Sequence, residues 1–173
     1  RLSDRDAVSD GRWWRDGEPI WVTAERQGLR TATYFWPGSE AEIRGIRPTY
    51  WVPYDGSIPG ETRVRQVLKW LDLPDSLRPR FLTLYFSEVD HAGHEHGPDA
   101  PEVAEAVQRV DGYLRLLVDG LRARGLLDRV NVLIVSDHGM TATSRERVIF
   151  LDDYIALDDV QVVNWSPVLM LTP

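Results

Sequence analysis

Short runs of apolar residues recur along this chain, and four of them are rich in β-branched and aromatic residues. Runs of this length and composition are typical of strands buried in a sheet. They predict strands over 31–36, 81–86, 130–135 and 147–151. The segment 48–59, which is rich in Tyr, Trp and Pro, is expected to be a loop.

Other apolar residues recur at spacings of three and four, which predicts helices with one buried face. One long helix is indicated between the second and third strands, with Asp99 as a candidate N-cap, Pro101 in its first turn and Gly125 after its end. Shorter helices are predicted over 20–27 and around 64–71. Since helices alternate with strands, the sequence predicts an α/β fold whose largely parallel sheet is covered on both faces. The stripe of the long helix consists of Val103, Val107, Val110, Leu114, Leu117 and Leu121.

Composition narrows the class of protein. The 173 residues are about one domain long, and 43% hydrophobic with 27% charged residues is ordinary for a globular chain. The net charge of −7 lacks the basic field that duplex binding uses, so we expect no binding to nucleic-acid duplexes. No apolar run approaches the roughly 18 residues of a membrane span, so no membrane segment is predicted. The chain has no cysteine, which excludes disulfides, cysteine-ligated zinc and thiol nucleophiles.

Two pairs of potential metal ligands follow two of the predicted strands. Asp90 and His94 come after the second strand, and Asp137 and His138 come after the third. Open α/β sheets keep their sites at the carboxyl ends of the strands, so we expect the two pairs to lie close together. Carboxylate oxygen and imidazole nitrogen suit a divalent ion such as zinc, and two pairs suggest two ions. Paired metal ions favour phosphoryl chemistry.

Glycines bear on the geometry of both pairs. Gly93 would let the backbone turn tightly enough for Asp90 and His94 to converge. Asp137 and His138 are adjacent, so they would lie on opposite faces of a continuing strand and can share a site only if the strand has ended. Gly139 supports that ending.

Other polar residues near the pairs are less suited to catalysis. Ser136 could be nominated as a nucleophile with His138 as its base, but it lacks the Gly-x-Ser-x-Gly elbow that exposes a catalytic serine. His91 and His96 flank the first pair, and a solvated or supporting position suits them better than direct metal ligation.

The two pairs belong to longer motifs, YFSEVDHAGHEHGP over 85–98 and SDHGM over 136–140. With these motifs, and with the segments 19–24 and 36–40, the chain resembles the nucleotide pyrophosphatase/phosphodiesterase family of the alkaline phosphatase superfamily. The resemblance covers most of 18–173, in order. It implies an alkaline phosphatase-like α/β/α sandwich with a largely parallel sheet.

The resemblance also implies a site with two zinc ions that activate a threonine or serine nucleophile. Carried onto this chain, it assigns Asp90 and His94 to one Zn²⁺ and Asp137 and His138 to the other. The complete protein would hydrolyse phosphodiester or pyrophosphate bonds, with nucleotides as the expected substrates, through a phospho-threonine intermediate.

Three residues match substrate contacts of the family. The resemblance places Tyr54 beside the base of a bound nucleotide. It places Trp36 and Glu40 in the wall of the substrate pocket. Residues of the substrate pocket vary more within a family than metal ligands do. These three assignments therefore rest on the resemblance alone.

The family's first metal-binding Asp and its nucleophile precede the matching segment, and its last His ligand follows it. We therefore expect residues 1–173 to be a partial catalytic domain, with a sheet incomplete at both ends, no catalytic nucleophile and no activity alone. An extracellular or periplasmic location is implied by the resemblance. Two alternatives stay open: a phosphonoacetate hydrolase-like or phosphomonoesterase member of the superfamily, and a non-catalytic metal-binding module.

Overall fold

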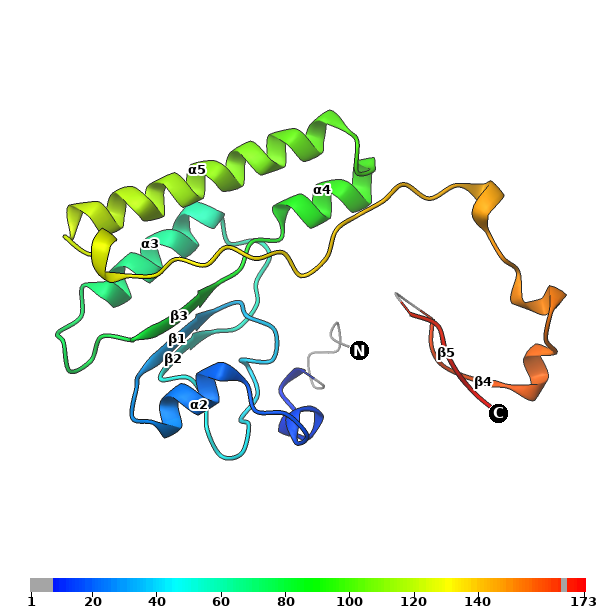
Figure 1. Cartoon of the computed structure of the whole chain (residues 1–173), viewed down its shortest axis with the longest axis horizontal. Coiled ribbons are helices and arrows are strands. Elements are labelled where there is room, and N and C mark those ends of the chain that lie inside the picture. The colour runs from blue at the N-terminus through cyan, green and yellow to red at the C-terminus, as the bar shows by residue number, and fades with distance from the viewer. Residues whose placement is uncertain (1–7, 166–167) are drawn as a thin grey trace. The chain divides into compact units, whose positions relative to one another are not determined.

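The computed structural model describes residues 8–165 and 168–173. The chain divides into two compact units, Arg1–Met140 and Thr141–Pro173 (Figure 1). Every element predicted before residue 126 falls in the first unit. Among the described residues, no helix combines the length and apolar character needed to cross a membrane.

The first unit is built on a parallel sheet of three strands, in the order β2-β1-β3. Strand β1 spans Thr31–Tyr34, β2 spans Tyr50–Val52 and β3 spans Phe81–Leu84. The register pairs Thr33 of the central strand with Trp51 on one side and Thr83 on the other. All three carboxyl ends therefore meet at one edge of the sheet.

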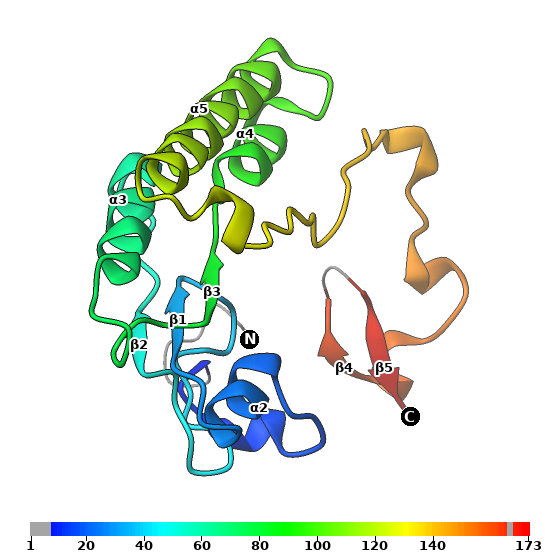
Figure 2. The same cartoon turned by 60° about the vertical axis from the view of Figure 1, so that its left-hand side comes forward.

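The alternation of side chains along β1 divides the core into two layers. Ala32 and Tyr34 point into the larger core, against the apolar face of α3 (Gly60–Leu71) and the end of α5 (Pro101–Ala123). Thr31 points the other way and bonds to Glu25 of α2 (Ile20–Arg26). Figures 1 and 2 show α2 on one face of the sheet and α3 and α5 on the other. This is the two-sided cover that the sequence predicts.

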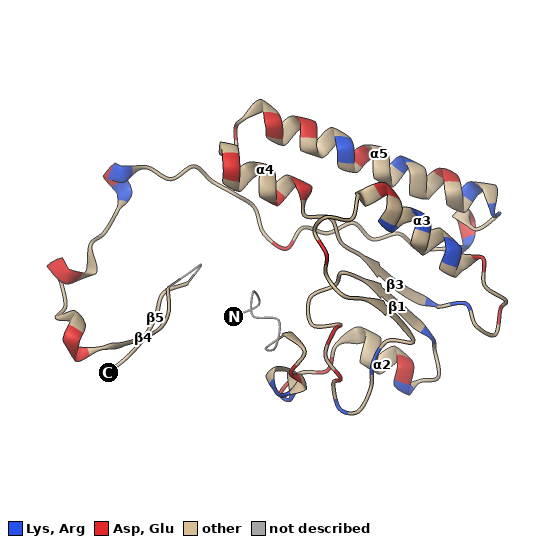
Figure 3. Ribbon diagram, turned by 180° about the vertical axis from the view of Figure 1, so that it is seen from behind, with Lys and Arg blue, Asp and Glu red and all other residues tan. Residues whose placement is uncertain are grey.

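Helix α4 (Glu88–His96) follows β3 and packs against α5. The exposed face of α5 carries both signs of charge along its length (Figure 3). Its ion pairs are spaced three or four residues apart and are highly exposed, so they stabilise the helix only slightly. The pairs are Arg109 with Glu105, Arg115 with Asp111, and Arg122 with Asp119.

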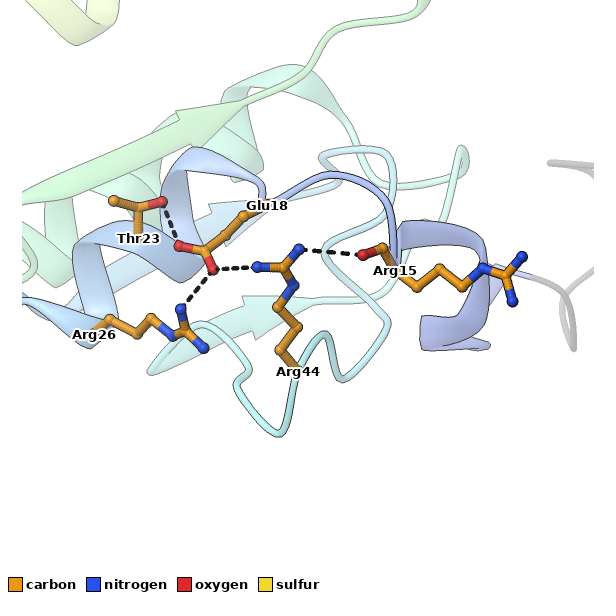
Figure 4. A network of polar contacts seen from close by, with 5 residues as sticks. All are labelled: Arg15, Glu18, Thr23, Arg26 and Arg44. Carbon is orange, nitrogen blue, oxygen red and sulfur yellow. Dashed lines mark hydrogen bonds and ion pairs between the residues drawn. The ribbon is translucent and has the colours of Figure 1, made fainter.

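A network around Glu18 fastens the segment before α2. Its carboxylate accepts hydrogen bonds from Thr23 and Arg26 of that helix and from Arg44 of a following loop. Arg44 also donates to the carbonyl oxygen of Arg15 (Figure 4). One carboxylate thus joins the amino-terminal segment, the helix and the loop.

The remaining elements are short. The second unit contains a hairpin of β4 (Gln161–Asn164) and β5 (Met170–Thr172), paired antiparallel. Short 3-10 helices occur in both units. They are η1 (Gly11–Trp14), η2 (Leu127–Arg129), η3 (Arg145–Arg147), η4 (Leu151–Asp153) and η5 (Leu157–Asp159).

Two predicted strands are wrong. Residues 131–135 have no regular structure, and the side chains of Leu133 and Ile134 are 82% and 71% exposed. A strand forms only where its backbone can hydrogen-bond to a neighbouring strand. No strand within 8–165 and 168–173 pairs with this run. Residues 130–135 therefore do not lie beside 81–86 as a strand of the sheet. The segment 147–151 is not a strand either. Its first residue ends η3, its last begins η4, and Ile149 and Phe150 between them are exposed.

Two smaller details also differ from expectation. The segment 48–59 is not entirely loop, because it contains β2. The N-cap of α5 is Ala100 rather than Asp99, while Pro101 occupies the first turn as predicted. The helices over 20–27 and 64–71 are confirmed within one or a few residues at their ends.

Candidate active site

Asp90 and His94 lie on α4, immediately beyond the carboxyl end of β3. Residues four apart on a helix share a face, and His94 Nε2 is 3.4 Å from Asp90 Oδ1. The sequence predicted that the pair converges, but on a tight turn. It converges on a helix instead, in which Gly93 has no special backbone role.

Gly93 contributes in a different way, by allowing close packing. A Cβ atom placed on Gly93 would lie 2.4 Å from Sδ of Met140. Met140 ends the segment that carries Asp137 and His138. The missing side chain therefore lets that segment lie directly against α4.

The second pair lies against the first. His138 Nε2 is 3.8 Å from Asp90 Oδ1 and 3.5 Å from Asp137 Oδ2. Both carboxylates thus lie within 3.8 Å of the same nitrogen atom. The distance between them is therefore below the about 10 Å at which a shared two-metal centre becomes impossible. The structure brings together all four residues proposed as metal ligands.

His138 responds to this negative environment. A hydrogen bond to the carbonyl oxygen of Gly139 raises its pKa, and the charges of Asp137 and Asp90 raise it further. Two carboxylates that favour a protonated imidazole would equally favour a bound cation.

Asp90 supplies the sharpest test of whether a metal fits. Its Oδ1 atom is buried and, in the described part of the chain, has no hydrogen-bond partner. An enclosed carboxylate oxygen without a donor is costly unless a cation takes that place. Oxygen and imidazole donors suit zinc. No group of three such side chains in 8–165 and 168–173 is arranged around a single point, so these residues form pairs rather than a closed site.

The neighbouring polar residues are engaged elsewhere. Ser136 Oγ donates to the backbone carbonyl of His138 at 2.5 Å, so this contact does not join a nucleophile to an imidazole base. His91 and His96 each lie near Glu95, at 3.4 Å and 3.7 Å, on the solvent side of α4. These contacts agree with the supporting positions expected from the sequence.

The three residues proposed to contact substrate do not form one group. The backbone N–H of Tyr54 donates to Glu40 Oε1 at 2.8 Å, and its hydroxyl lies 3.4 Å from Ser87 Oγ, just before α4. Trp36 instead packs against the cluster on the α2 side of the sheet, with Trp21 and its neighbours.

Sequence reasoning missed the residues that support Tyr54. The Tyr54 ring meets Phe35 at 5.3 Å between ring centres and Tyr85 at 6.3 Å. Burial raises the pKa of Tyr85, and the charges of Asp137 and Asp90 add to the effect, which sets this ring beside the metal-ligand candidates. Tyr85 belongs to the motif over 85–98, so the sequence could have indicated that it lies near the site. Arg63, which lies over the Phe35 ring and donates to the backbone carbonyl of Tyr85, gave no such signal.

Comparison with known proteins gives a consistent result. The whole chain, residues 1–173, matches the profile of the family described as type I phosphodiesterase / nucleotide pyrophosphatase. It is 46% identical over 161 residues to human ectonucleotide pyrophosphatase/phosphodiesterase family member 1, and 50% identical over 142 residues to venom phosphodiesterase 2 of Crotalus adamanteus. These matches cover 92% and 82% of the chain but only 17% of each relative.

Solved structures agree on the fold. The chain superposes on murine ectonucleotide pyrophosphatase/phosphodiesterase 5 with a TM-score of 0.85 and 35% identity, covering 95% of this chain and 44% of that one. An inactive threonine-to-alanine variant of the murine protein, in complex with AMP, matches equally well. The human protein of the same name has a TM-score of 0.86. The predicted alkaline phosphatase-like α/β fold is confirmed.

Proposed function

Because the chain belongs to the type I phosphodiesterase / nucleotide pyrophosphatase family, we propose that the protein containing it hydrolyses phosphodiester or pyrophosphate bonds of nucleotides with the help of two zinc ions. The observation that carries the proposal is the convergence of two Asp/His pairs around Asp90 Oδ1, a buried atom that accepts no hydrogen bond in the described structure. The chain spans about a sixth of the curated relatives, so this activity is proposed for the whole protein.

Asp90 and His94 would hold one zinc ion, and Asp137 and His138 the other. When bound, the ions supply positive charge that lowers the pKa of the attacking hydroxyl and balances the charge of the phosphate oxygens. The chain's own residues fix the donors in place. Helix α4 aims the first pair, and the contact of Met140 with Gly93 holds the second pair against it.

The nucleophile we propose is a threonine elsewhere in the protein, whose hydroxyl oxygen would bond to phosphorus while the leaving alcohol or phosphate departs. Water would then cleave the new bond between threonine oxygen and phosphorus, which releases the product and restores the free threonine. The inactivity of the murine threonine-to-alanine variant supports that choice. The hydrogen bond of Ser136 to a backbone carbonyl argues against a local serine.

Nucleotides are the proposed substrates because Tyr54 offers a partly exposed ring close to the candidate metal centre. The ring is 37% exposed and touches Tyr85, which lies beside Asp90 and Asp137. An aromatic face there can stack on a base. The AMP bound by the murine relative supports this substrate class.

We propose an extracellular or periplasmic location, and the names of the relatives support the extracellular one. Those relatives include ectonucleotide pyrophosphatases and venom enzymes.

The test uses the full-length protein. Zinc is removed with a chelator and restored, while zinc content and turnover of thymidine monophosphate p-nitrophenyl ester are measured. We expect activity to follow zinc content. Asp137→Asn should lower both, whereas the control Glu95→Gln, an exposed residue on α4, should change neither. Full activity without zinc, or in Asp137→Asn, would refute the proposal. Turnover of phosphate monoesters alone would indicate the phosphomonoesterase alternative.

A further inference from the structure

Arg63 of α3 is buried to an unusual degree for its residue type. Its exposed fraction is 2%, whereas arginine is rarely enclosed unless it has an acidic partner. Among the described residues, no carboxylate lies within ion-pair distance of the guanidinium. A buried charge of this kind must be compensated by neutral groups around it.

Within the described part of the chain, the guanidinium makes three contacts, all with neutral groups. Nε donates to the carbonyl oxygen of Ile58 at 2.9 Å, and Nη1 donates to that of Tyr85 at 3.0 Å. Its carbon atom lies 4.9 Å from the centre of the Phe35 ring, a cation–π arrangement. Phe35 directly follows β1 and Tyr85 directly follows β3. One side chain therefore ties the carboxyl ends of two neighbouring strands.

Phe35 needs such support. It is 3% exposed and has a φ of 60°, in the left-handed region that aromatic residues seldom adopt. Strained residues persist where the surroundings fix them, and such residues cluster at functional sites. Arg63 covers one side of this ring, so it helps to keep Phe35 in that conformation.

The ring of Tyr54 rests on both residues that Arg63 fixes. It meets Phe35 edge to face at 5.3 Å and Tyr85 in a tilted contact at 6.3 Å. At 37% exposure, Tyr54 is far more accessible than Phe35 and Arg63 behind it. The contacts with Phe35 and Tyr85 thus set the orientation of the Tyr54 ring.

We propose that Arg63 is the positioning residue of the base-binding site: it acts through Phe35 and Tyr85 to hold Tyr54 in the orientation that stacks on a nucleotide base. This inference rests on the proposed function. Arg63 is too deeply buried to touch a substrate, so its effect reaches the substrate only through the aromatic rings.

The test compares two substrates with the same leaving group, in the full-length protein. Thymidine monophosphate p-nitrophenyl ester carries a base, and methyl p-nitrophenyl phosphate does not. Arg63→Lys keeps the charge but loses the planar fork that reaches both carbonyls. We expect it to raise KM for the nucleotide ester about fivefold or more, with kcat and the methyl ester little changed. The matched control is Arg65→Lys. Arg65 is exposed on the same helix and forms an ion pair with Glu61, one turn earlier.

A double variant shows whether Arg63 acts through Tyr54. Tyr54→Ala should raise KM for the nucleotide ester, and adding Arg63→Lys should raise it no further, because the ring being positioned is gone. Independent, multiplying effects of the two changes would overturn the proposal. An unchanged KM ratio between the two esters in Arg63→Lys would overturn it as well. If Tyr54→Ala itself leaves that ratio unchanged, the base-stacking part of the proposed function fails instead.

Stability is measured for each variant. Should Arg63→Lys fail to fold, Phe35→Leu replaces it, because it removes the ring on which both Arg63 and Tyr54 rest. The same selective rise in KM is expected. If neither variant folds, or Phe35→Leu affects both esters equally, the arginine has only a structural role and the proposal is wrong.

Discussion

Asp90 combines one enclosed oxygen with two nearby imidazoles. Its Oδ1 atom is buried and accepts no hydrogen bond in the described structure, while the Nε2 atoms of His94 and His138 lie 3.4 Å and 3.8 Å away. The side chain as a whole is 42% exposed, so we expect the enclosed oxygen to favour a bound cation more than it weakens the metal-free fold.

Replacing this carboxylate should separate the two effects. In the full-length protein, we expect Asp90→Asn to leave the metal-free melting temperature unchanged or higher, because an amide can be buried at lower cost than a charge. The rise in melting temperature on adding zinc should shrink or vanish. Calorimetry with and without zinc measures both. A variant that melts lower without zinc and keeps the full zinc-dependent rise would show that Asp90 is structural.

Gly93 and Gly112 form a matched pair of helical glycines. A Cβ on Gly93 would meet Met140 Sδ at 2.4 Å, whereas one on Gly112 of α5 would meet nothing within 4 Å. Alanine improves helix propensity by about 1 kcal/mol, so Gly112→Ala should stabilise the protein by roughly that amount. Gly93→Ala should stabilise the protein less than Gly112→Ala, because the flexible Met140 side chain has to move away from the added methyl group. Denaturant unfolding of both variants measures the difference. In a Met140→Ala background the two alanine substitutions should have equal effects. Equal effects with Met140 in place would contradict the packing.

At this scale the sequence predicted correctly that the two Asp/His pairs meet, but for a reason that holds only in part. Asp90 and Asp137 were expected to meet at the carboxyl ends of two strands, and they do meet although only the run before Asp90 is a strand. The support behind Tyr54 could not be found in this way. Burial of Arg63 depends on the carbonyl oxygens and the ring that the fold places around it, and an arginine beside an apolar stripe is typical of a solvated helix edge.

At the scale of elements, helices α2, α3 and α5 followed from periodicity, and strands β1 and β3 followed from composition, because each has its neighbours within the described sheet and layers. Helix α4 was missed, since a tight turn was expected in its place. Strand β2 was missed because only three residues pair inside a Pro-rich segment. The runs 130–135 and 147–151 have strand-like composition but no pairing partner. Composition gives the strand propensity of a segment, but whether a strand forms depends on a pairing partner elsewhere in the molecule.

Glu25 joins three elements and gives stability a dependence on pH. Its Oε1 atom accepts hydrogen bonds of 2.7–2.8 Å from the backbone and side chain of Thr31 and of Thr49, before β2. Burial raises its pKa, but these bonds outweigh burial and hold the pKa below 4.5. A lowered pKa in the folded state stabilises the fold above pH 4.5, and this contribution is lost as pH falls through the folded-state value.

We therefore expect Glu25→Gln to lower the free energy of unfolding by about 1–3 kcal/mol at neutral pH, because charged acceptors make the stronger bonds. The difference from the parent should narrow below pH 4.5, where the parent carboxylate begins to lose its charge advantage. Urea unfolding across this range measures it. Glu61→Gln, at the exposed pair with Arg65, is the control and should change little. A difference independent of pH would show that the charge of Glu25 is irrelevant.

At the scale of the whole molecule, the net charge of −7 favours repulsion between copies of the chain, while an exposed apolar run favours association. Leu133, Ile134 and Val135 are 71–82% exposed and have no regular structure and no strand partner among the described residues. Exposed apolar segments with free backbone groups favour pairing with other chains.

The 173-residue chain should accordingly self-associate through this run, and one added charge there should prevent it. We expect Leu133→Glu to reduce light scattering at high concentration while the melting temperature stays nearly constant, because an 82% exposed side chain contributes little to the core. The control Val64→Glu places the same charge at a site with 0% exposure and should cost about 3 kcal/mol or more. If Leu133→Glu instead unfolds the chain as Val64→Glu does, the run is buried in solution and belongs to the core after all.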